Sequence, residues 1–220
     1  LVDSFNEMDL PSQGAQREDF LASYGEEISQ ILSKSNPQNV WVIQGWMFGY
    51  QRDIWNEKTL AALLSKVPDS RMLIMDMACD YNGTFWKNGM NWEVFKGFFG
   101  KPWTYGWIPN MGGKTGYTGV MSFYANHLFE AVNSKQKGTL AGCGLFMEGL
   151  ENNEAIYELL ADSMWRSEPV DLKEWTRAYC FARYGGAPKE VLDGWSLLYE
   201  SCYGSFTDHP GFGWQTGRPG

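Results

Sequence analysis

Apolar and polar positions along the chain alternate between two kinds of segment. Five short segments are almost continuously apolar and rich in β-branched and aromatic residues, as expected for strands that are buried on both faces. Between them, apolar residues recur every three or four positions, which predicts amphipathic helices. The predicted strands are residues 1–6, 39–46, 71–79, 101–110 and 138–149. The predicted helices are residues 17–35, 56–67, 118–133 and 153–165.

This alternation favours an α/β fold built around a parallel sheet. The strand centres are spaced by about 31 to 38 residues, and an eight-fold β/α barrel of about 250 residues has roughly 31 residues in each unit. A doubly wound open sheet fits the spacing nearly as well, but it usually carries a glycine-rich phosphate loop. The nearest candidate, NMGGKTG (110–116), lacks both common forms of that loop. We therefore predict that residues 1–168 form the C-terminal portion of a (β/α)8 barrel.

The pattern changes after Pro169. Two further amphipathic segments, 171–185 and 188–204, each end on a glycine, as helix C-caps often do. We predict that residues 169–220 begin an all-α domain. The chain opens on LVDSF, which has the pattern of the middle of a strand, and we expect the sequence to be a fragment of a longer protein.

Charge and composition exclude several functional classes. The formal net charge is −8 and no basic block is present, so the electrostatic footprint of a nucleic-acid-binding protein is missing. No apolar run approaches the eighteen residues of a membrane span. The cysteines form no CxxC pair and the two histidines are isolated, so a zinc site is not expected and a structural role is favoured for the histidines. These residues are Cys79, Cys143, Cys180, Cys202, His127 and His209.

The aromatic content is high, with eleven Trp, eleven Tyr and thirteen Phe. These rings fit a large core or a sugar-binding cleft, and composition alone does not separate the two interpretations. The cysteine spacing does not decide whether disulfides form.

The chemistry of the predicted strand ends narrows the function, because active sites of β/α barrels lie there. The residues at these ends are Asn6 and Glu7, Gln44 and Trp46, Asp76 and Asp80, Trp107 and Asn110, and Glu148 with Asn152 nearby. Two carboxylates with amides and tryptophans are what glycoside hydrolysis requires. Structural interpretations stay open: either glutamate could interact with a helix dipole, Trp46 could be core, and Asp76 could be a buried, hydrogen-bonded acid.

Six segments, in their order and spacing, resemble the α-N-acetylglucosaminidase family, glycoside hydrolase family 89. They are FNEM (5–8), VWVIQGWMF (40–48), LIMDM (73–77), NMGGKTG (110–116), MEGLENNEAIYELLADSMWR (147–166) and ARYG (182–185). The resemblance covers nearly the whole chain and is weakest in 80–107 and after 204. It implies a retaining exo-glycosidase that releases terminal α-linked N-acetylglucosamine without a metal or organic cofactor. It also implies a catalytic barrel with a helical domain after it.

The resemblance implies roles for individual residues. Glu7 matches the general acid/base, Glu148 matches the nucleophile, and the sugar pocket is lined by Asn6, Gln44, Trp46 and Asn110. Retention by double displacement requires the two carboxyl groups to lie about 5–5.5 Å apart, whereas inversion requires roughly 6.5–9.5 Å.

The substrate expected from the resemblance is a glycan with a terminal α-N-acetylglucosamine, either heparan sulfate-like or mucin-like. The family includes a lysosomal heparan sulfate enzyme and bacterial enzymes that act on host glycans. The loop 80–100 and the segment WTYGWIPNMGG (103–113) have a bacterial character, which favours a secreted or periplasmic location over a lysosomal one. The alternative function is a glycan-binding barrel that has lost catalysis, and the presence of both glutamates counts against it.

Overall fold

The computed structural model describes residues 1–11, 15–113, 119–149 and 152–205 of the 220-residue chain. The chain divides into two compact units. The first unit comprises Leu1–Trp107 and Ser134–Gly144, and the second comprises Ile108–Asn133 and Leu145–Gly220.

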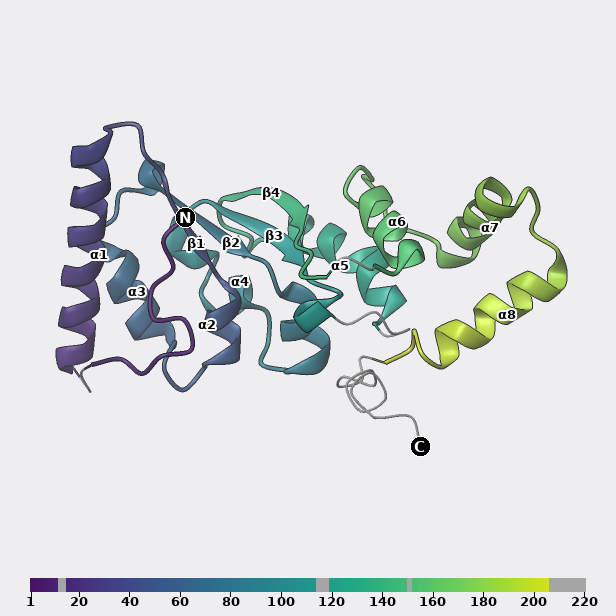
Figure 1. The fold of residues 1–220 in the computed structure, drawn as a ribbon, viewed down its shortest axis with the longest axis horizontal. Helices are drawn as coiled ribbons and strands as arrows, with labels where there is room; N and C mark the ends of the chain where they lie inside the picture. The colour runs from purple at the N-terminus through teal and green to yellow at the C-terminus, as the bar shows by residue number, and fades with distance from the viewer. Residues whose placement is uncertain (12–14, 114–118, 150–151, 206–220) are drawn as a thin grey trace. The chain divides into compact units, whose positions relative to one another are not determined.

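A four-stranded sheet with the order β1-β2-β3-β4 organises the first unit (Figure 1). Its strands are β1 (Trp41–Gln44), β2 (Met72–Asp76), β3 (Trp103–Trp107) and β4 (Leu140–Leu145). The β1–β2 and β2–β3 pairs are parallel, with Trp41 opposite Met72 and Ile74 opposite Trp103. Four of the five predicted strands are therefore confirmed, and so is the parallel pairing of the first three.

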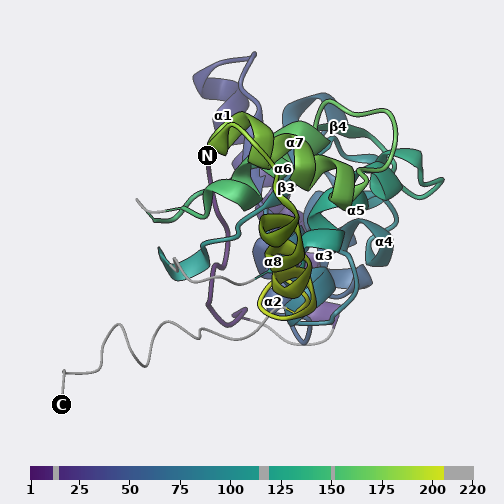
Figure 2. The same ribbon diagram turned by 90° about the vertical axis from the view of Figure 1, so that its right-hand side faces the viewer.

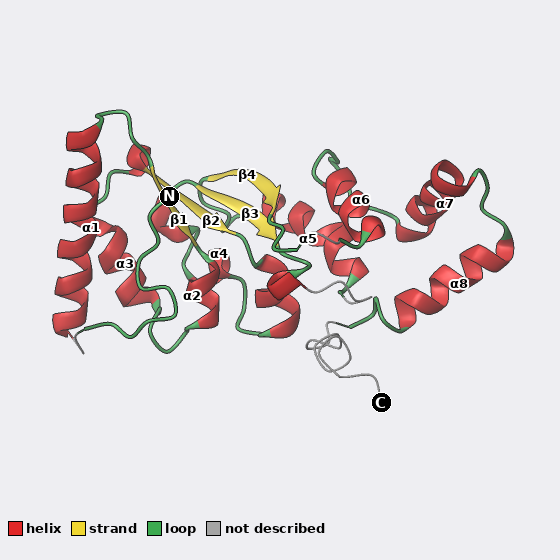
Figure 3. Ribbon diagram, viewed as in Figure 1, coloured by secondary structure: helices red, strands yellow, loops and turns green. Residues whose placement is uncertain are grey.

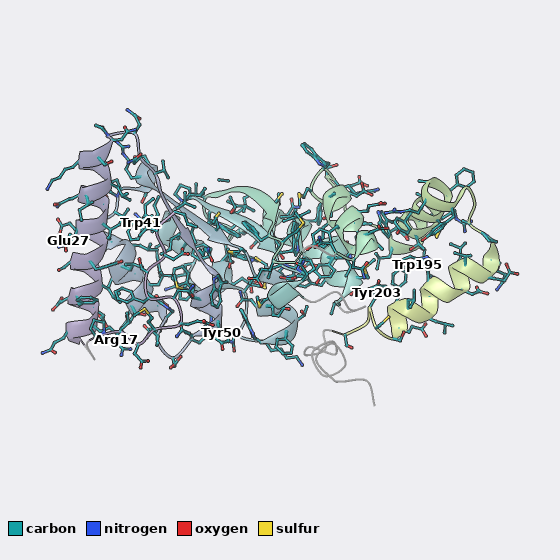
Figure 4. The ribbon with its side chains drawn as sticks, viewed as in Figure 1. Arg17, Glu27, Trp41, Tyr50, Trp195 and Tyr203 are labelled. Atoms are coloured by element: carbon teal, nitrogen blue, oxygen red, sulfur yellow. The ribbon has the colours of Figure 1, made fainter. Side chains whose placement is uncertain are left out.

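The segment predicted as the first strand, residues 1–6, is not a strand, and this prediction is wrong. Its beginning does run beside β1. The Val2 backbone N–H donates to the Val42 carbonyl at 3.1 Å, and Trp41 Nε1, labelled in Figure 4, donates to the Val2 carbonyl at 2.7 Å.

The strand-like pairing stops at Asp3 for a local reason. The Asp3 side chain accepts the Gln44 backbone N–H at 3.0 Å, so a carboxylate takes the place that a strand carbonyl would occupy. Phe5 and Glu7 then adopt left-handed backbone angles, with φ of 58° and 51°. Such angles are incompatible with an extended strand, and the chain turns there instead.

Two long helices pack against each other in the first unit (Figure 1). They are α1 (Ala15–Ser35) and α3 (Glu57–Ser65), and both confirm the sequence prediction. Asn56 caps α3: its side chain accepts the Lys58 and Thr59 backbone N–H groups, and the Thr59 side chain accepts the Asn56 backbone N–H. This reciprocal arrangement is a capping box and fixes where the helix begins.

Short helices fill the connections that follow the strands of the first unit. They are α2 (Trp46–Tyr50), η1 (Asp69–Arg71), η2 (Tyr81–Phe85), α4 (Asn91–Val94) and η3 (Phe98–Gly100). The last three lie in the glycine- and tryptophan-rich segment for which the sequence predicts a loop.

The core of the first unit is largely aromatic. The Trp92 and Trp103 rings stack with centroids 6.3 Å apart, and Tyr105 meets Trp107 edge to face at 5.0 Å. All four side chains are buried. Offset-stacked and edge-to-face pairs of this kind are favourable beyond the area that they bury. A large part of the aromatic content therefore serves the core.

The second unit is helical in its described residues (Figure 3). Its elements are η4 (Met111–Gly113), α5 (Met121–Asn133), α6 (Glu154–Ser163), α7 (Leu172–Tyr184) and α8 (Lys189–Glu200). α5 and α6 pack against each other, as Figures 1 and 2 both show. None of the helices in the described part of the chain combines the length and the apolar character that a membrane span needs.

The two predicted glycine C-caps have different outcomes. Gly185 follows α7 in a left-handed conformation with φ of 75°, and its N–H donates to the Phe181 carbonyl, so this prediction is confirmed. The prediction for Gly204 is wrong, because α8 ends at Glu200. The backbone leaves the helix at Ser201, whose φ of −114° and ψ of −104° are not helical. Beyond it, the Tyr203 carbonyl accepts the Met121 backbone N–H at 3.1 Å, and the rings of Tyr203 and Trp195, both labelled in Figure 4, stack on each other.

A carboxyl group is enclosed at the end of β2. Asp76 is fully buried, and its Oδ1 accepts Asn91 Nδ2 at 2.7 Å, while its Oδ2 has no hydrogen-bond partner among the described residues. Burial raises the pKa of Asp76 to about 7, and hydrogen bonds from Asn91 and Cys79 and the positive charge of Arg52 act in the opposite direction. This agrees with the interpretation of Asp76 as a buried, hydrogen-bonded acid.

We expect the Gly25→Ala substitution to destabilise the first unit. Alanine normally stabilises a helix interior by about 1 kcal/mol relative to glycine. A Cβ at Gly25 of α1, however, would lie 2.1 Å from the Leu63 carbonyl oxygen of α3. The two helices would have to separate, at a net cost of about 1–3 kcal/mol, which urea denaturation of the full-length protein would measure.

Gly194→Ala is the matched control for this experiment. Gly194 also lies inside a helix, α8, but a Cβ there meets nothing within 4 Å. This variant should be as stable as the wild type or more stable by about 0.5–1 kcal/mol. Equal effects of the two substitutions would contradict the close approach of α1 and α3.

We expect Asp76→Asn to remove a specific pH dependence of stability. A carboxyl group whose folded-state pKa is raised from 3.8 to about 7 favours the folded state fully below pH 3.8, and this contribution is lost as the pH rises through 7. The variant should therefore gain stability relative to the wild type between about pH 4 and pH 8, by up to about 4 kcal/mol. Urea midpoints measured across this range would test it.

The control is the same substitution at an exposed position of the first unit, Asp53→Asn, which makes the same chemical change outside the buried site. Parallel pH curves for the wild type and Asp76→Asn would show that Asp76 keeps an ordinary pKa.

Candidate active site

Glu148 lies three residues beyond the end of β4, with an exposed side chain. Two hydrogen bonds hold it against the loop that follows β3. Its backbone N–H donates to Asn110 Oδ1 at 3.1 Å, and its carboxylate Oε2 accepts the Gly112 backbone N–H. A backbone N–H that donates to a carboxylate limits the orientations that the carboxylate can take. The carboxylate is thus exposed but held.

Gly112 can provide this donor because of its backbone conformation. Its φ is 70°, a left-handed angle that glycine adopts without steric cost. A side chain at this position would favour a different backbone angle and would turn the N–H away from Glu148. The glycine of the NMGG segment is therefore part of the site.

Asn110 connects the segments around Glu148. It is only 2 % exposed, and its Oδ1 accepts both the Glu148 N–H and the Tyr157 hydroxyl, the latter at 3.1 Å. Its Nδ2 donates to Asn152 Oδ1 at 2.8 Å and to the Gly149 carbonyl at 3.4 Å. We call this group of residues, Asn110 with Glu148, Gly149, Asn152 and Tyr157, the Asn110 network.

The network has a consequence for the predicted role of Asn110. The side chain is buried, and its amide group hydrogen-bonds to groups of the protein on both its oxygen and its nitrogen. The prediction that Asn110 lines the sugar pocket stays a prediction.

Tyr157 is not among the predicted site residues, although the sequence carries a signal for it. Asn153 is the N-cap of α6, and its side chain accepts the Ile156 backbone N–H. A residue four positions after the N-cap returns to the same side of a helix, and Tyr157 occupies that position. The spacing therefore predicts that the Tyr157 side chain points toward the segment preceding α6.

The two adjacent asparagines of this segment have separate tasks. Asn152 belongs to the Asn110 network, whereas Asn153 caps α6 and donates to the Tyr203 hydroxyl at 2.6 Å. Glu154 and Glu158 of α6 are exposed and form ion pairs with Arg183 at 3.0 and 2.6 Å.

The remaining predicted site residues lie in the first unit. Asn6 and Glu7 share the exposed turn that follows the N-terminal segment. Gln44 ends β1 and Trp46 begins α2, and Trp46 Nε1 donates to Gln44 Oε1 at 3.0 Å. The structure therefore brings Gln44 and Trp46 together, and Asn6 and Glu7 lie beside each other.

Trp46 belongs to a row of aromatic side chains that the sequence analysis did not identify. Its ring lies 5.7 Å from that of Tyr50, labelled in Figure 4, and Tyr50 lies 5.4 Å from Trp86. Trp46 and Trp86 are partly exposed and Tyr50 is exposed. The i, i+4 spacing of Trp46 and Tyr50 on α2 was the available signal. Flat rings that reach solvent are suited to stacking on sugar faces.

Glu148 and Asn110 belong to the second unit, whereas Glu7, Asn6, Gln44 and Trp46 belong to the first. The expected separation of 5–5.5 Å between the two carboxyl groups stays a prediction.

The surroundings of His127 agree with a structural role for this histidine. The His127 ring stacks on Phe123 with centroids 4.3 Å apart, and burial lowers its pKa to about 4. His209 lies outside the described residues.

All four cysteines are free thiols. Within the described ranges, no group of three or more acidic, histidine or cysteine side chains is arranged to hold a metal ion.

Comparison with known proteins connects this arrangement to a family. The chain is 30 % identical to human alpha-N-acetylglucosaminidase over 203 residues, which are 92 % of this chain and 26 % of that protein. It thus spans about a quarter of the length of this relative.

Solved structures from Clostridium perfringens have the same fold. A family 89 glycoside hydrolase in complex with 2-acetamido-1,2-dideoxynojirmycin matches 96 % of this chain and 23 % of its own, with a TM-score of 0.73 and 23 % identity. A variant of the enzyme with two glutamates changed to glutamine, in complex with its substrate GlcNAc-α-1,4-galactose, matches with a TM-score of 0.71 and the same identity and coverage.

Residues 1–167 match the family model for the TIM-barrel domain of alpha-N-acetylglucosaminidase. This match and the fold of the solved structures confirm the predicted α/β barrel class. The chain therefore belongs to the alpha-N-acetylglucosaminidase (NAGLU) family, and carries part of its TIM-barrel domain.

Proposed function

We propose that the protein is a retaining exo-glycosidase that releases terminal α-linked N-acetylglucosamine from glycans, with Glu148 as nucleophile and Glu7 as general acid/base. The observation that carries this proposal is the geometry of Glu148, whose exposed carboxylate is held by the Gly112 N–H and whose backbone is fixed by Asn110. A nucleophile must reach the substrate from a rigid position, and an exposed carboxylate that is held in this way supports the role.

The reaction proceeds by two displacements at the anomeric carbon. In the first, a Glu148 oxygen bonds to that carbon while Glu7 donates a proton to the departing glycosidic oxygen, which leaves a covalent glycosyl–enzyme. In the second, Glu7 removes a proton from water, the water oxygen attacks the same carbon, and the Glu148 ester bond breaks. Two inversions restore the α configuration, and both carboxyl groups regain their original protonation states.

Residues of the first unit supply binding groups in this proposal. Trp46 offers a partly exposed ring, and its N–H holds the Gln44 amide oxygen. The Gln44 amide is thereby oriented, and its nitrogen can donate to a sugar hydroxyl. Asn6, next to Glu7 in the turn, provides a further amide.

The names of the relatives support the substrate class. The human relative is an alpha-N-acetylglucosaminidase, and the bacterial relative binds GlcNAc-α-1,4-galactose as its substrate. Heparan sulfate-like and mucin-like glycans both carry the required terminal sugar. The net charge of −8 disfavours a long sulfated chain as the substrate. We further propose that the protein is secreted or periplasmic rather than lysosomal.

A glycan-binding protein without catalysis is the second candidate. The row formed by Trp46, Tyr50 and Trp86 favours it, because exposed rings bind sugars whether or not a reaction follows. The two candidates differ in turnover, which the following experiments measure.

We expect the full-length protein to release the α-anomer of N-acetylglucosamine first from an aryl α-N-acetylglucosaminide. Proton NMR resolves the two anomers before mutarotation equilibrates them. Initial appearance of the β-anomer would mean direct attack by water and would contradict the role of Glu148. Binding of the sugar without release of product would favour the glycan-binding candidate.

The two glutamates should respond differently to replacement by glutamine. Glu148→Gln should lower kcat by about 10⁴-fold for every substrate while leaving binding of N-acetylglucosamine nearly unchanged, because the nucleophile is lost. Glu7→Gln should lower kcat by about 10²–10⁴-fold for leaving groups that need a proton, and much less for 2,4-dinitrophenol, which leaves as an anion.

Glu130→Gln, an exposed change on α5, serves as the control and should retain full activity. Equal sensitivity of Glu7→Gln to good and poor leaving groups would argue against Glu7 as the acid.

A further inference from the structure

We infer that Asn110 and Tyr157 are positioning residues for the nucleophile, and that they act through the backbone of Glu148 rather than on the sugar. The inference rests on the proposed role of Glu148. It assigns a new function to Tyr157 and a different function to Asn110 from the one that the family resemblance implies.

The Asn110 oxygen connects Glu148 to α6. It accepts the Glu148 N–H and the Tyr157 hydroxyl, both at 3.1 Å. One acceptor therefore joins the residue that bears the nucleophile to the first turn of α6. A helix is a more rigid support than a loop. The hydrogen bonds of this oxygen therefore fix the position of Glu148 relative to α6.

The Asn110 nitrogen is used as well. It donates to Asn152 Oδ1 and to the Gly149 carbonyl, which lie after Glu148 in the chain. A single side chain thus contacts Glu148, Gly149 and Asn152. Because Asn110 is buried, water does not compete strongly for these hydrogen bonds.

The segment that contains Asn110 also contacts the Glu148 carboxylate. Asn110 and Gly112 belong to one short segment, and the Gly112 N–H donates to Glu148 Oε2. The same segment therefore fixes the backbone of Glu148 with a side chain and its carboxylate with a backbone donor. A shift of this segment would misplace the attacking oxygen, and misplacement by about 1 Å can lower a rate about 100-fold.

The inference predicts a split between kcat and KM in the full-length protein. Tyr157→Phe removes the hydrogen bond to Asn110 and keeps the ring, so we expect kcat to fall about 3- to 10-fold with KM and the inhibition constant of N-acetylglucosamine unchanged. Asn110→Ala removes every contact of the amide, and we expect kcat to fall about 100-fold, again without weaker binding of the sugar.

The rescue variant is Asn110→Asp, which keeps the oxygen that accepts from Glu148 and Tyr157. It should recover part of the activity that Asn110→Ala loses, at a pH where the new carboxyl group is protonated. A purely structural role would lower the amount of folded protein, so the melting temperature and the active-site concentration are measured for each variant. Tyr184→Phe and Asn133→Ala, both exposed, are the matched controls and should behave as wild type.

The outcomes separate this inference from the proposed function. An active wild type whose KM or inhibition constant rises in the Asn110 variants would mean that Asn110 binds the sugar, and would overturn the inference. Full activity in Tyr157→Phe and Asn110→Ala would also overturn it. A folded wild type that releases no sugar would contradict the proposed function and, with it, the role of any residue that positions Glu148.

Discussion

The amide of Asn110 is the interaction on which the local structure around Glu148 depends. It is the point at which the loop after β3, the segment after β4 and the first turn of α6 are hydrogen-bonded to one side chain. A buried amide has two donors and an acceptor oxygen to satisfy, and leaving them unpaired is costly. The same requirement that stabilises the amide therefore orders three segments that meet at the candidate nucleophile.

The first unit uses burial differently. Its core contains paired aromatic rings beside aliphatic side chains, and it encloses polar groups such as Asp76. Around the short helices after β1 and β2 the same kind of side chain reaches solvent, in the row formed by Trp46, Tyr50 and Trp86. The aromatic residues thus have two uses: the buried rings pack in the core, and the rings that reach solvent form the row.

Much of the fold could be predicted from the sequence because its signals are local. Continuous apolar runs identified β1 to β4, and helical periodicity identified α1, α3, α5, α6 and α7. The failures occurred where side chains or distant groups replaced expected backbone partners. Asp3 accepts a strand N–H and ends the pairing of the N-terminal segment, and beyond the end of α8 the Tyr203 carbonyl accepts a backbone N–H of α5. Neither substitution of partners leaves a periodic trace in the sequence.

The site was predictable as a set of residues and not as a geometry. Chemistry at strand ends, with the family resemblance, identified Glu148 and Asn110. It did not predict that the Asn110 side chain hydrogen-bonds to the Glu148 backbone. That link joins residues 38 positions apart in the chain, and its hydroxyl partner on α6 is 47 positions from Asn110. Closing a loop of this length costs entropy before any contact repays it. The orientation of the Glu148 carboxylate therefore depends on residues far apart in the chain having come together, so a chain that has its helices and strands but lacks these contacts would lack an oriented nucleophile.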